Sequence, residues 1–341
     1  MDITTVADDL IVLHDGIDVQ RYEHLAPTTA YEFGRLWITT MPRPEGELLC
    51  RIATVNDVHF GELECGRIDD NPQGPIQRVG PGEEPYPETM NKGAIAEIAA
   101  IDPVAVVVKG DLSNDGAPAE WAAFEEHYRG AFGDRLHVVR GNHDSYQYQK
   151  GYEGDQWIEC PGLDIGLLDT VIPGHTTGQL TDEQLEWLDD HVARSDRPVL
   201  VMGHHQQWTG GSHADNGSRG EGYFGLAPAA SIGLDAIAAR RPSIIGYTAG
   251  HTHRHRVRRM AGAPDVPTIE VGCVKDFPGT WAEYRVYETA VMQVVHRIST
   301  PDALRWSERC RHLYSDFGLD YESYALGQLE DRCFTMEFRR P

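Results

Sequence analysis

The segment that decides the fold is residues 104–111, which read VAVVVKGD. Its first five residues, Val104–Val108, form a continuous apolar run that is typical of a strand buried on both faces of a sheet. A glycine and Asp111 follow after one lysine. On either side, predicted helices such as 92–100 and 118–132 alternate with further predicted strands. This alternation predicts an α/β fold with a layered arrangement around a central sheet.

Four other predicted strands also end in polar side chains with glycine among them or nearby. The motifs that follow these strands are Asp57-Val58-His59, Gly141-Asn142-His143-Asp144, Gly203-His204-His205 and Gly250-His251-Thr252-His253. Ligands of an α/β sheet bind just beyond the carboxyl ends of its strands, so we expect all five clusters to converge. The glycines allow the backbone to turn sharply at these points.

The residue types in these clusters indicate a metal site. Aspartate oxygen and histidine nitrogen are donors that suit Zn, Mn and Fe, whereas a calcium site would consist mostly of oxygen. Asp57 with His59, and His251 with His253, have the spacing of two that puts side chains on one face of an extended chain. The donors are too many for one tetrahedral ion. Two ions about 3.5–4 Å apart that share a carboxylate would use them well.

Together, the five motifs resemble the signature of the calcineurin-like metallophosphoesterase superfamily. They occur in order from Asp57 to His253, which is well over half of the chain. The resemblance implies a layered α/β/β/α sandwich with mixed central sheets. Around it we expect three regions: an N-terminal β extension at 1–48, the metallophosphoesterase domain at 49–298, and a C-terminal appendage of helix and strand at 299–341.

The resemblance also implies a role for each motif residue. Asp57, His59 and His253 would hold the first metal, and Asn142, His204 and His251 the second. Asp111 would bridge the two ions, which would be Fe, Mn or Zn. His143 would bind the phosphoryl oxygens or protonate the leaving alkoxide, and Asp144 would orient it. The residues expected at the substrate beside His143 are His205 and Arg254. Gln206 stands where many relatives have proline, a departure that touches no ligand.

The mechanism that follows is metal-assisted hydrolysis. A hydroxide shared by the two ions would attack phosphorus in line, while the ions neutralise the charge that develops on the equatorial oxygens. His143 would help the leaving group to depart. No phosphoenzyme is needed, so the reaction requires no serine or cysteine nucleophile.

The ligand set resembles the branch of the superfamily that hydrolyses cyclic nucleotides and glycerophosphodiesters. We therefore expect a small-molecule phosphodiester as substrate. One alternative is a phosphomonoesterase related to purple acid phosphatases, but Leu112, Ser113 and Asn114 stand where those enzymes place a tyrosine ligand. Another is a catalytically silent metal-binding interaction protein, which would have no use for His143. The net charge of −23 disfavours nucleic acid as a partner.

We also form expectations for several segments outside the motifs. The irregular loop 61–86 follows a predicted ligand and is expected to be a lid or specificity loop. Trp208, Tyr223 and Phe224 flank a glycine-rich loop that contains His213, and they would either stack on a base or pack in the protein. Apolar runs before residue 48 predict one or two edge strands, and residues 254–298 predict consecutive antiparallel strands. His255 is expected to face solvent, and the segment after 301 to pack on the domain or form a homo-oligomer contact.

The cysteines, the first residues and the apolar stretches of the sequence indicate the cellular compartment. Six cysteines are scattered without a CxxC pair, which fits neither a dense disulfide framework nor a zinc knuckle. The first residues lack a basic start followed by an apolar run, and no stretch approaches the roughly 18 apolar residues of a membrane span. We therefore expect a cytoplasmic protein without a membrane partner.

Overall fold

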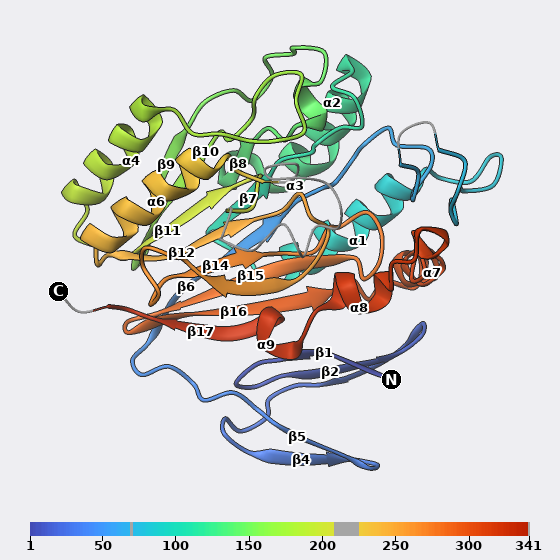
Figure 1. Cartoon of the computed structure of the whole chain (residues 1–341). Helices are drawn as coiled ribbons and strands as arrows, with labels where there is room; N and C mark the ends of the chain where they lie inside the picture. Colours follow the sequence, from blue (N-terminus) through green and yellow to red (C-terminus); the bar gives the residue numbers. More distant parts are fainter. Residues whose placement is uncertain (69–70, 208–224, 340–341) are drawn as a thin grey trace.

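The computed structural model describes residues 1–68, 71–207 and 225–339. Two six-stranded sheets stack face to face, and helices cover their outer faces (Figure 1). Each sheet contains both parallel and antiparallel neighbours. The predicted α/β/β/α layering with mixed sheets is therefore confirmed.

The first sheet combines strands from the beginning of the domain with strands from the end of the chain. Its order is β17 (Cys333–Glu337), β16 (Ala290–Arg297), β15 (Thr280–Tyr287), β6 (Leu48–Val55), β7 (Ala105–Lys109) and β8 (Leu136–Val139). β6, β7 and β8 are parallel, whereas β15, β16 and β17 pair antiparallel. The carboxyl ends of the three parallel strands thus lie at one edge of the sheet.

The second sheet has four parallel strands at its centre. Its order is β13 (Arg256–Arg259), β14 (Pro267–Glu270), β12 (Ile244–Ala249), β11 (Val199–Gly203), β10 (Leu163–Leu168) and β9 (Gln156–Cys160). The expectation of consecutive antiparallel strands over 254–298 is wrong in one respect. β13 and β14 belong to this sheet, whereas β15 and β16 belong to the first, so residues 271–279 cross between the layers.

Apolar side chains fill the space between the sheets, among them Ile52, Val107, Ile165 and Met202. On the outer face of the first sheet lie α1 (Tyr86–Ala100), α2 (Pro118–Phe124), a π-helical turn (Glu125–Arg129) and α3 (Gly130–Phe132). The outer face of the second sheet is covered by α4 (Asp182–Arg194) and α6 (Pro228–Arg240). α4 begins at a capping box, in which Thr181 Oγ1 accepts a hydrogen bond from Gln184 N and Gln184 Oε1 accepts one from Thr181 N.

The N-terminal strands do not join the main sheet, which corrects the expectation of edge strands. β1 (Asp2–Val6), β2 (Ile11–Asp15) and β3 (Asp18–Tyr22) form a small antiparallel sheet, and β4 (Ala30–Phe33) forms a two-stranded sheet with β5 (Leu36–Thr39). Residues such as Leu10 and Val12 pack on Met292 and Val294. The small sheet therefore covers the part of the first sheet around β16, while the C-terminal strand β17 takes the edge position (Figure 1).

The chain after β16 returns across the first sheet. It contains α7 (Pro301–Arg309), α8 (Tyr321–Leu326) and α9 (Leu329–Arg332) before β17. Single 3-10 turns occur at Gly133–Arg135, His143–Ser145 and Ser315–Phe317. None of the helices that the structure describes is both long enough and apolar enough to cross a membrane.

Candidate metal centre

The predicted ligands meet at the carboxyl ends of parallel strands from both sheets. Asp57, Asp111 and Asn142 follow β6, β7 and β8 of the first sheet, and His204 and the His251 loop follow β11 and β12 of the second. One group of donor atoms within 4.8 Å of one another consists of Asp57, His59 and His253. Two further groups are Asp57, Asp111 and His204, and His204, His205 and His251.

Asp111 lies between the two predicted sets of donors. Its Oδ2 atom is 3.5 Å from Nε2 of His59 and 3.4 Å from Nε2 of His204. Its Oδ1 atom accepts a hydrogen bond of 2.9 Å from the backbone N–H of His143. A carboxylate that faces a histidine on each side is placed as a bridging ligand would be.

His204 is held in the tautomer that a metal ligand needs. Its Nδ1 atom lies 2.8 Å from the carbonyl oxygen of Lys109, which can only accept, so Nδ1 carries a proton and Nε2 is the nitrogen that a metal would bind. Nε2 lies 3.0 Å from Oδ1 of Asn142, whose amide is oriented by a 2.6 Å bond from Nδ2 to the hydroxyl of Tyr146. Burial lowers the pKa of His204, but the Asp111 carboxylate outweighs it and raises the pKa to about 9. The local field therefore favours positive charge at this point.

The first set contains a histidine whose buried nitrogens lack hydrogen bonds. His59 is 1% exposed, and in the described part of the chain neither ring nitrogen has a hydrogen-bond partner. His253 Nε2 lies 3.6 Å from Oδ1 of Asp57. Unsatisfied polar atoms in a protein interior are costly unless a ligand uses them. These residues thus fit a cation held by His59, His253 and Asp57.

The backbone of the predicted ligands is unusual. The φ angle is +55° at Asp57, +49° at His59, +51° at Asp111, +68° at His251 and +54° at His253. Residues other than glycine rarely adopt this left-handed region, because Cβ crowds the carbonyl oxygen. Strained backbone of this kind concentrates at functional sites, where the surrounding structure imposes it.

The glycines of the motifs provide space as well as flexible backbone. Gly110 has a φ of +90°, and a Cβ added there would lie 2.5 Å from Nδ1 of His204. A Cβ at Gly141 would collide with the Asp111 carboxylate, and one at Gly250 would lie 2.7 Å from Oδ2 of Asp57. The loops therefore approach one another so closely that a side chain at any of these three glycine positions would not fit.

His143 lies beside the predicted ligands, but Asp144 does not orient it, which corrects that expectation. The ring centroid of His143 is 4.5 Å from that of His59, and its Nδ1 lies 2.7 Å from the carbonyl oxygen of Asn114. The Asp144 side chain turns away into the protein, where it accepts hydrogen bonds from the backbone N–H groups of Gly141, Leu112 and Ser113 at 2.8–3.0 Å. Asp144 therefore ties the Asp111 loop to the Asn142 loop.

The two other residues expected at the substrate already have partners. The ring of His205 is fully buried, with Nδ1 2.8 Å from Oγ1 of Thr170 and Nε2 3.1 Å from the carbonyl oxygen of Thr176. Arg254 is also buried, and its Nε donates a 2.9 Å hydrogen bond to Glu270. Both side chains thus have hydrogen-bond partners inside the protein, and contact of either one with the substrate stays a prediction.

His255 also differs from its expectation, because it is 1% exposed and does not face solvent. Its Nδ1 accepts a hydrogen bond from Gly272 N, and its Nε2 lies 3.1 Å from Oγ1 of Thr280. The residue precedes β13 and packs against the 271–279 crossover, a long-range contact that no local pattern indicates. Trp208, Tyr223, Phe224 and the loop 209–222 with His213 lie outside the described residues, as do positions 69 and 70 of the predicted lid.

Sequence reasoning missed Tyr146. Its ring centroid lies 4.8 Å from that of His143, and its hydroxyl accepts the hydrogen bond that orients Asn142. The available signal was its spacing of four from Asn142, which acquires meaning only because a 3-10 turn forms at His143–Ser145.

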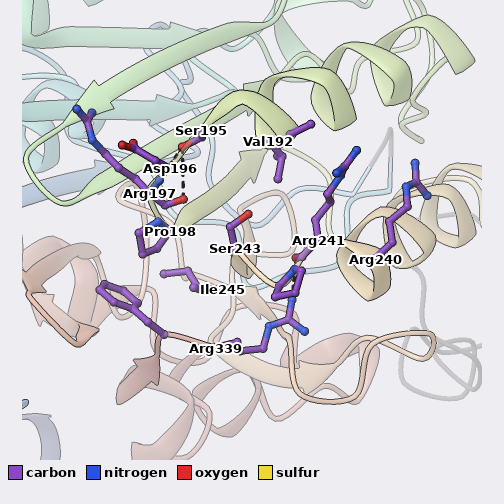
Figure 2. Close-up of a pocket in the computed structure, with 13 residues that line it drawn as sticks. Val192, Ser195, Asp196, Arg197, Pro198, Arg240, Arg241, Ser243, Ile245 and Arg339 are labelled. Carbon is purple, nitrogen blue, oxygen red and sulfur yellow. Dashed lines mark hydrogen bonds between the residues drawn. The ribbon is translucent and has the colours of Figure 1, made fainter. Parts of the chain in front are cut away.

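A separate hollow of about 420 Å³ is lined by residues none of which is a predicted ligand (Figure 2). It is lined by the ends of α4 and α6 and by residues at the amino ends of β11 and β12, opposite to the ligand loops. Its arginines are engaged: Arg197 pairs with Asp164, Arg240 and Arg241 pair with Asp189, and Arg339 donates to backbone carbonyls. The hollow is thus distinct from the predicted centre.

Comparison with known proteins points to one family. Residues 50–255 match the family model described as calcineurin-like phosphoesterase. A glycerophosphodiester phosphodiesterase from Enterobacter lignolyticus is 28% identical over 171 residues, 44% of this chain and 56% of that enzyme. A cAMP/cGMP dual specificity phosphodiesterase from Mycobacterium tuberculosis is 31% identical over 120 residues, 31% of this chain and 38% of that enzyme. The chain thus spans about half the length, or less, of these curated relatives.

Solved structures resemble the chain in fold. A dimetal phosphatase from Danio rerio superposes with a TM-score of 0.56 at 15% identity, covering 74% of this chain and 97% of that one. A purple acid phosphatase from yellow lupin (Lupinus luteus) seeds gives a TM-score of 0.52 at 13% identity, covering 83% and 60%. At these identities the likeness concerns the arrangement of the two sheets and their helices, not the reaction.

Proposed function

This chain belongs to the calcineurin-like phosphoesterase family, and from that premise we propose that it hydrolyses a small-molecule phosphodiester with the help of two metal ions. The observation that carries the proposal is the position of Asp111. Its carboxylate faces His59 of one donor set and His204 of the other, at 3.5 and 3.4 Å. A single buried carboxylate between two histidine-containing sets is what a pair of ions about 3.5–4 Å apart requires.

The donors divide between the ions as follows. Asp57, His59 and His253 would hold the first ion, Asn142, His204 and His251 the second, and Asp111 both. Carboxylate, amide and imidazole donors accept Fe, Mn and Zn alike. When bound, two such ions would polarise the phosphoryl group and promote attack by water.

The contribution of His143 follows from its hydrogen bond. One of its ring nitrogens lies within 4.8 Å of the donor atoms of His59 and Asp111, so the ring borders the place where a phosphate would bind. Nδ1 is bound to the carbonyl of Asn114, which leaves Nε2 for the substrate. In the protonated ring, Nε2–H can be given to the leaving alkoxide or can bind a phosphoryl oxygen. Tyr146 orients Asn142 beside it.

The choice of a small diester rests on three supports. Relatives of the matched region are described as cyclic nucleotide and glycerophosphodiester phosphodiesterases. Leu112, Ser113 and Asn114 after the bridging aspartate include no tyrosine, unlike the pattern expected of purple acid phosphatases. The net charge of −23 repels a long polyanion, so we propose that nucleic acid is not a substrate.

The test is a comparison of kcat/KM for bis-(p-nitrophenyl) phosphate and p-nitrophenyl phosphate after reconstitution with Mn. The Asn142→Ala variant, which lacks one predicted metal ligand, gives the background rate of hydrolysis. A preference for the diester that disappears in the variant supports the proposal. A preference for the monoester makes the protein a phosphomonoesterase, and no turnover of either ester by protein that binds metal makes it a catalytically silent metal-binding protein.

Two further proposals concern the protein's setting. We propose a reducing compartment such as the cytoplasm, because all six cysteines are buried and free. A homo-oligomer formed through residues 299–341 is also a proposal. Because β17 in this segment completes the first sheet, light scattering of the full chain over a range of concentrations tests it better than truncation. A constant monomer mass would contradict it.

A further inference from the structure

We propose that the C-terminal segment is part of the metal centre: Tyr321 of α8 holds Asp276, and Asp276 orients His253 for the first ion. The inference rests on the proposed metal centre and adds positioning residues to it. Asp276 lies in the 271–279 crossover and Tyr321 far beyond it, and the family model ends at residue 255. Neither residue belongs to the motifs that indicated the site.

The ring of His253 lies between two carboxylates. Its Nε2 atom is 3.6 Å from Oδ1 of the predicted ligand Asp57, and its Nδ1 atom is 3.4 Å from Oδ2 of Asp276. A carboxylate behind the far nitrogen of a ligating histidine fixes its tautomer and ring orientation and strengthens it as a donor. Asp276 is thus placed to present Nε2 of His253 to the ion.

Asp276 is itself held by donors from separate parts of the chain. It is 0% exposed, and its Oδ1 atom accepts a 2.7 Å hydrogen bond from the hydroxyl of Tyr321 and a 3.0 Å one from Sγ of Cys273. Cys65 Sγ, in the 61–86 loop, lies 3.7 Å from Oδ2. A buried carboxylate needs such donors to remain ionised. The short bond from Tyr321 is the one that fixes the direction of the carboxylate.

α8 also supports the loop that carries His253 at two other points. The hydroxyl of Tyr324 donates a 2.9 Å hydrogen bond to the carbonyl of Thr252, and the N–H of His255 donates a 3.0 Å one to the carbonyl of Ala325. The residues on both sides of His253 are therefore bonded to α8. This arrangement makes α8 a support for the ligand loop and not merely a cover for the hydrophobic core.

The other histidine of the first set also faces a carboxylate, and a residue of the same crossover binds that carboxylate. Nδ1 of His59 lies 3.6 Å from Oε2 of Glu62, whose carboxylate is bound by Lys275 Nζ at 2.6 and 2.7 Å. Lys275 directly precedes Asp276. The second set differs, because the far nitrogen of His204 faces the backbone carbonyl of Lys109. Substitution of Asp276 should therefore weaken binding of the first ion and leave binding of the second ion unchanged.

The experiment measures Mn binding by isothermal titration calorimetry of metal-free protein, which is independent of turnover. Asp276→Asn keeps the shape of the side chain but removes its charge, and Tyr321→Phe removes only the hydroxyl. The control is Tyr152→Phe, because Tyr152 also donates a 2.8 Å hydrogen bond to a carboxylate, that of Glu125, which is not a predicted ligand. His253→Gln and Asn142→Ala identify which binding step belongs to which ion.

Asp276→Asn should lower the affinity for the first ion by about 10–100-fold, which is the usual loss when the partner of a ligating histidine is removed. The affinity for the second ion should change by less than about twofold. Tyr321→Phe should lower the affinity for the first ion by a smaller factor. In both variants the electron paramagnetic resonance line shape of one bound Mn should change. Tyr152→Phe should bind both ions as the wild type does.

Two results would overturn the inference while leaving the proposed function intact. One is an equal loss at both ions, and the other is unchanged binding in both Asp276→Asn and Tyr321→Phe accompanied only by lower thermal stability. If Asp276→Asn does not fold, Tyr321→Phe alone decides. Wild-type protein that binds no ion would contradict the metal centre itself, and the inference with it.

Discussion

Nε2 of His204 lies 3.4 Å from Oδ2 of Asp111, although the two residues follow strands of different sheets. The contact exists because β7 and β11 both end at the same side of the molecule, where their glycine-containing turns bring the loops together. The carboxylate is 2% exposed, so it acts on its neighbours with little screening by water. The predictions about catalysis begin from this pair.

Asp111→Asn should abolish hydrolysis and reduce the bound metal from two ions to one or fewer. Loss of a bridging carboxylate removes several kcal/mol of transition-state stabilisation, which corresponds to a fall in kcat of roughly 1,000-fold or more. Steady-state kinetics and elemental analysis of dialysed protein provide the measurements. Asp134→Asn, at an exposed position, is the matched control and should behave as the wild type. Normal activity in Asp111→Asn would refute the bridging role.

His143→Gln should have an effect that depends on the leaving group. An alkyl alkoxide leaves with difficulty unless it is protonated, so hydrolysis of an alkyl diester should fall by about 100–10,000-fold. p-Nitrophenolate departs without a proton, so hydrolysis of bis-(p-nitrophenyl) phosphate should fall much less. The ratio of kcat for the two esters measures the difference. Equal losses would mean that the ring binds the phosphoryl oxygens instead.

Gly141→Ala should disturb the centre without changing any ligand. The added methyl group would meet the Asp111 carboxylate, and such overpacking typically costs about 1–3 kcal/mol. Urea unfolding and metal content measure the effect. Gly130→Ala is the control, since a Cβ there has nothing within 4 Å and the glycine opens a helix, so it should be neutral or slightly stabilising. A variant at Gly141 as stable and metal-rich as the wild type would contradict the steric argument.

Acid stability should depend on Glu283, which lies on β15 away from the metal loops. Burial raises its pKa, but His296 and Arg285 outweigh burial and lower it from 4.5 to about 2. A carboxyl with a depressed folded-state pKa stabilises the protein above pH 4.5, and this contribution is lost as the pH falls from about 4.5 to about 2. In Glu283→Gln the free energy of unfolding should therefore vary less steeply over that range. Identical slopes from chemical unfolding at several pH values would disprove it.

Much of the architecture follows from local sequence. The apolar run Val104–Val108 predicts a buried strand, and β7 occupies 105–109 between β6 and β8 of the first sheet. The capping-box pattern of Thr181 and Gln184 predicts the residue at which α4 begins, because this pattern depends on two residues that are only three positions apart. The six predicted aspartate and histidine ligands meet because each follows a strand end, and parallel strands end together. Asn142 joins them through its contact with His204.

The remaining features depend on contacts between distant segments. Strand periodicity in β1–β5 does not show that β17 takes the sheet edge, because that choice is made by pairing between residues 290–294 and 333–337. His255 has the pattern of an exposed strand residue but lies against the crossover of 271–279. Asp144 adjoins His143 in sequence, yet the local turn directs its carboxylate to backbone N–H groups of another loop. Such directions are set by the tertiary structure.

The division of the proposed ligands between the two sheets has a mechanical consequence. The first ion would take Asp57 and His59 from one layer and His253 from the other, and the second ion would take Asn142 from one and His204 and His251 from the other. Each ion would thus cross-link the layers, and its binding energy would count towards folding. Removal of the ions by a chelator should leave the layers joined at this end by side-chain packing and by hydrogen bonds such as that between His204 and the Lys109 carbonyl. Proteolysis should then start at the ligand loops, where solvent would enter between the two layers.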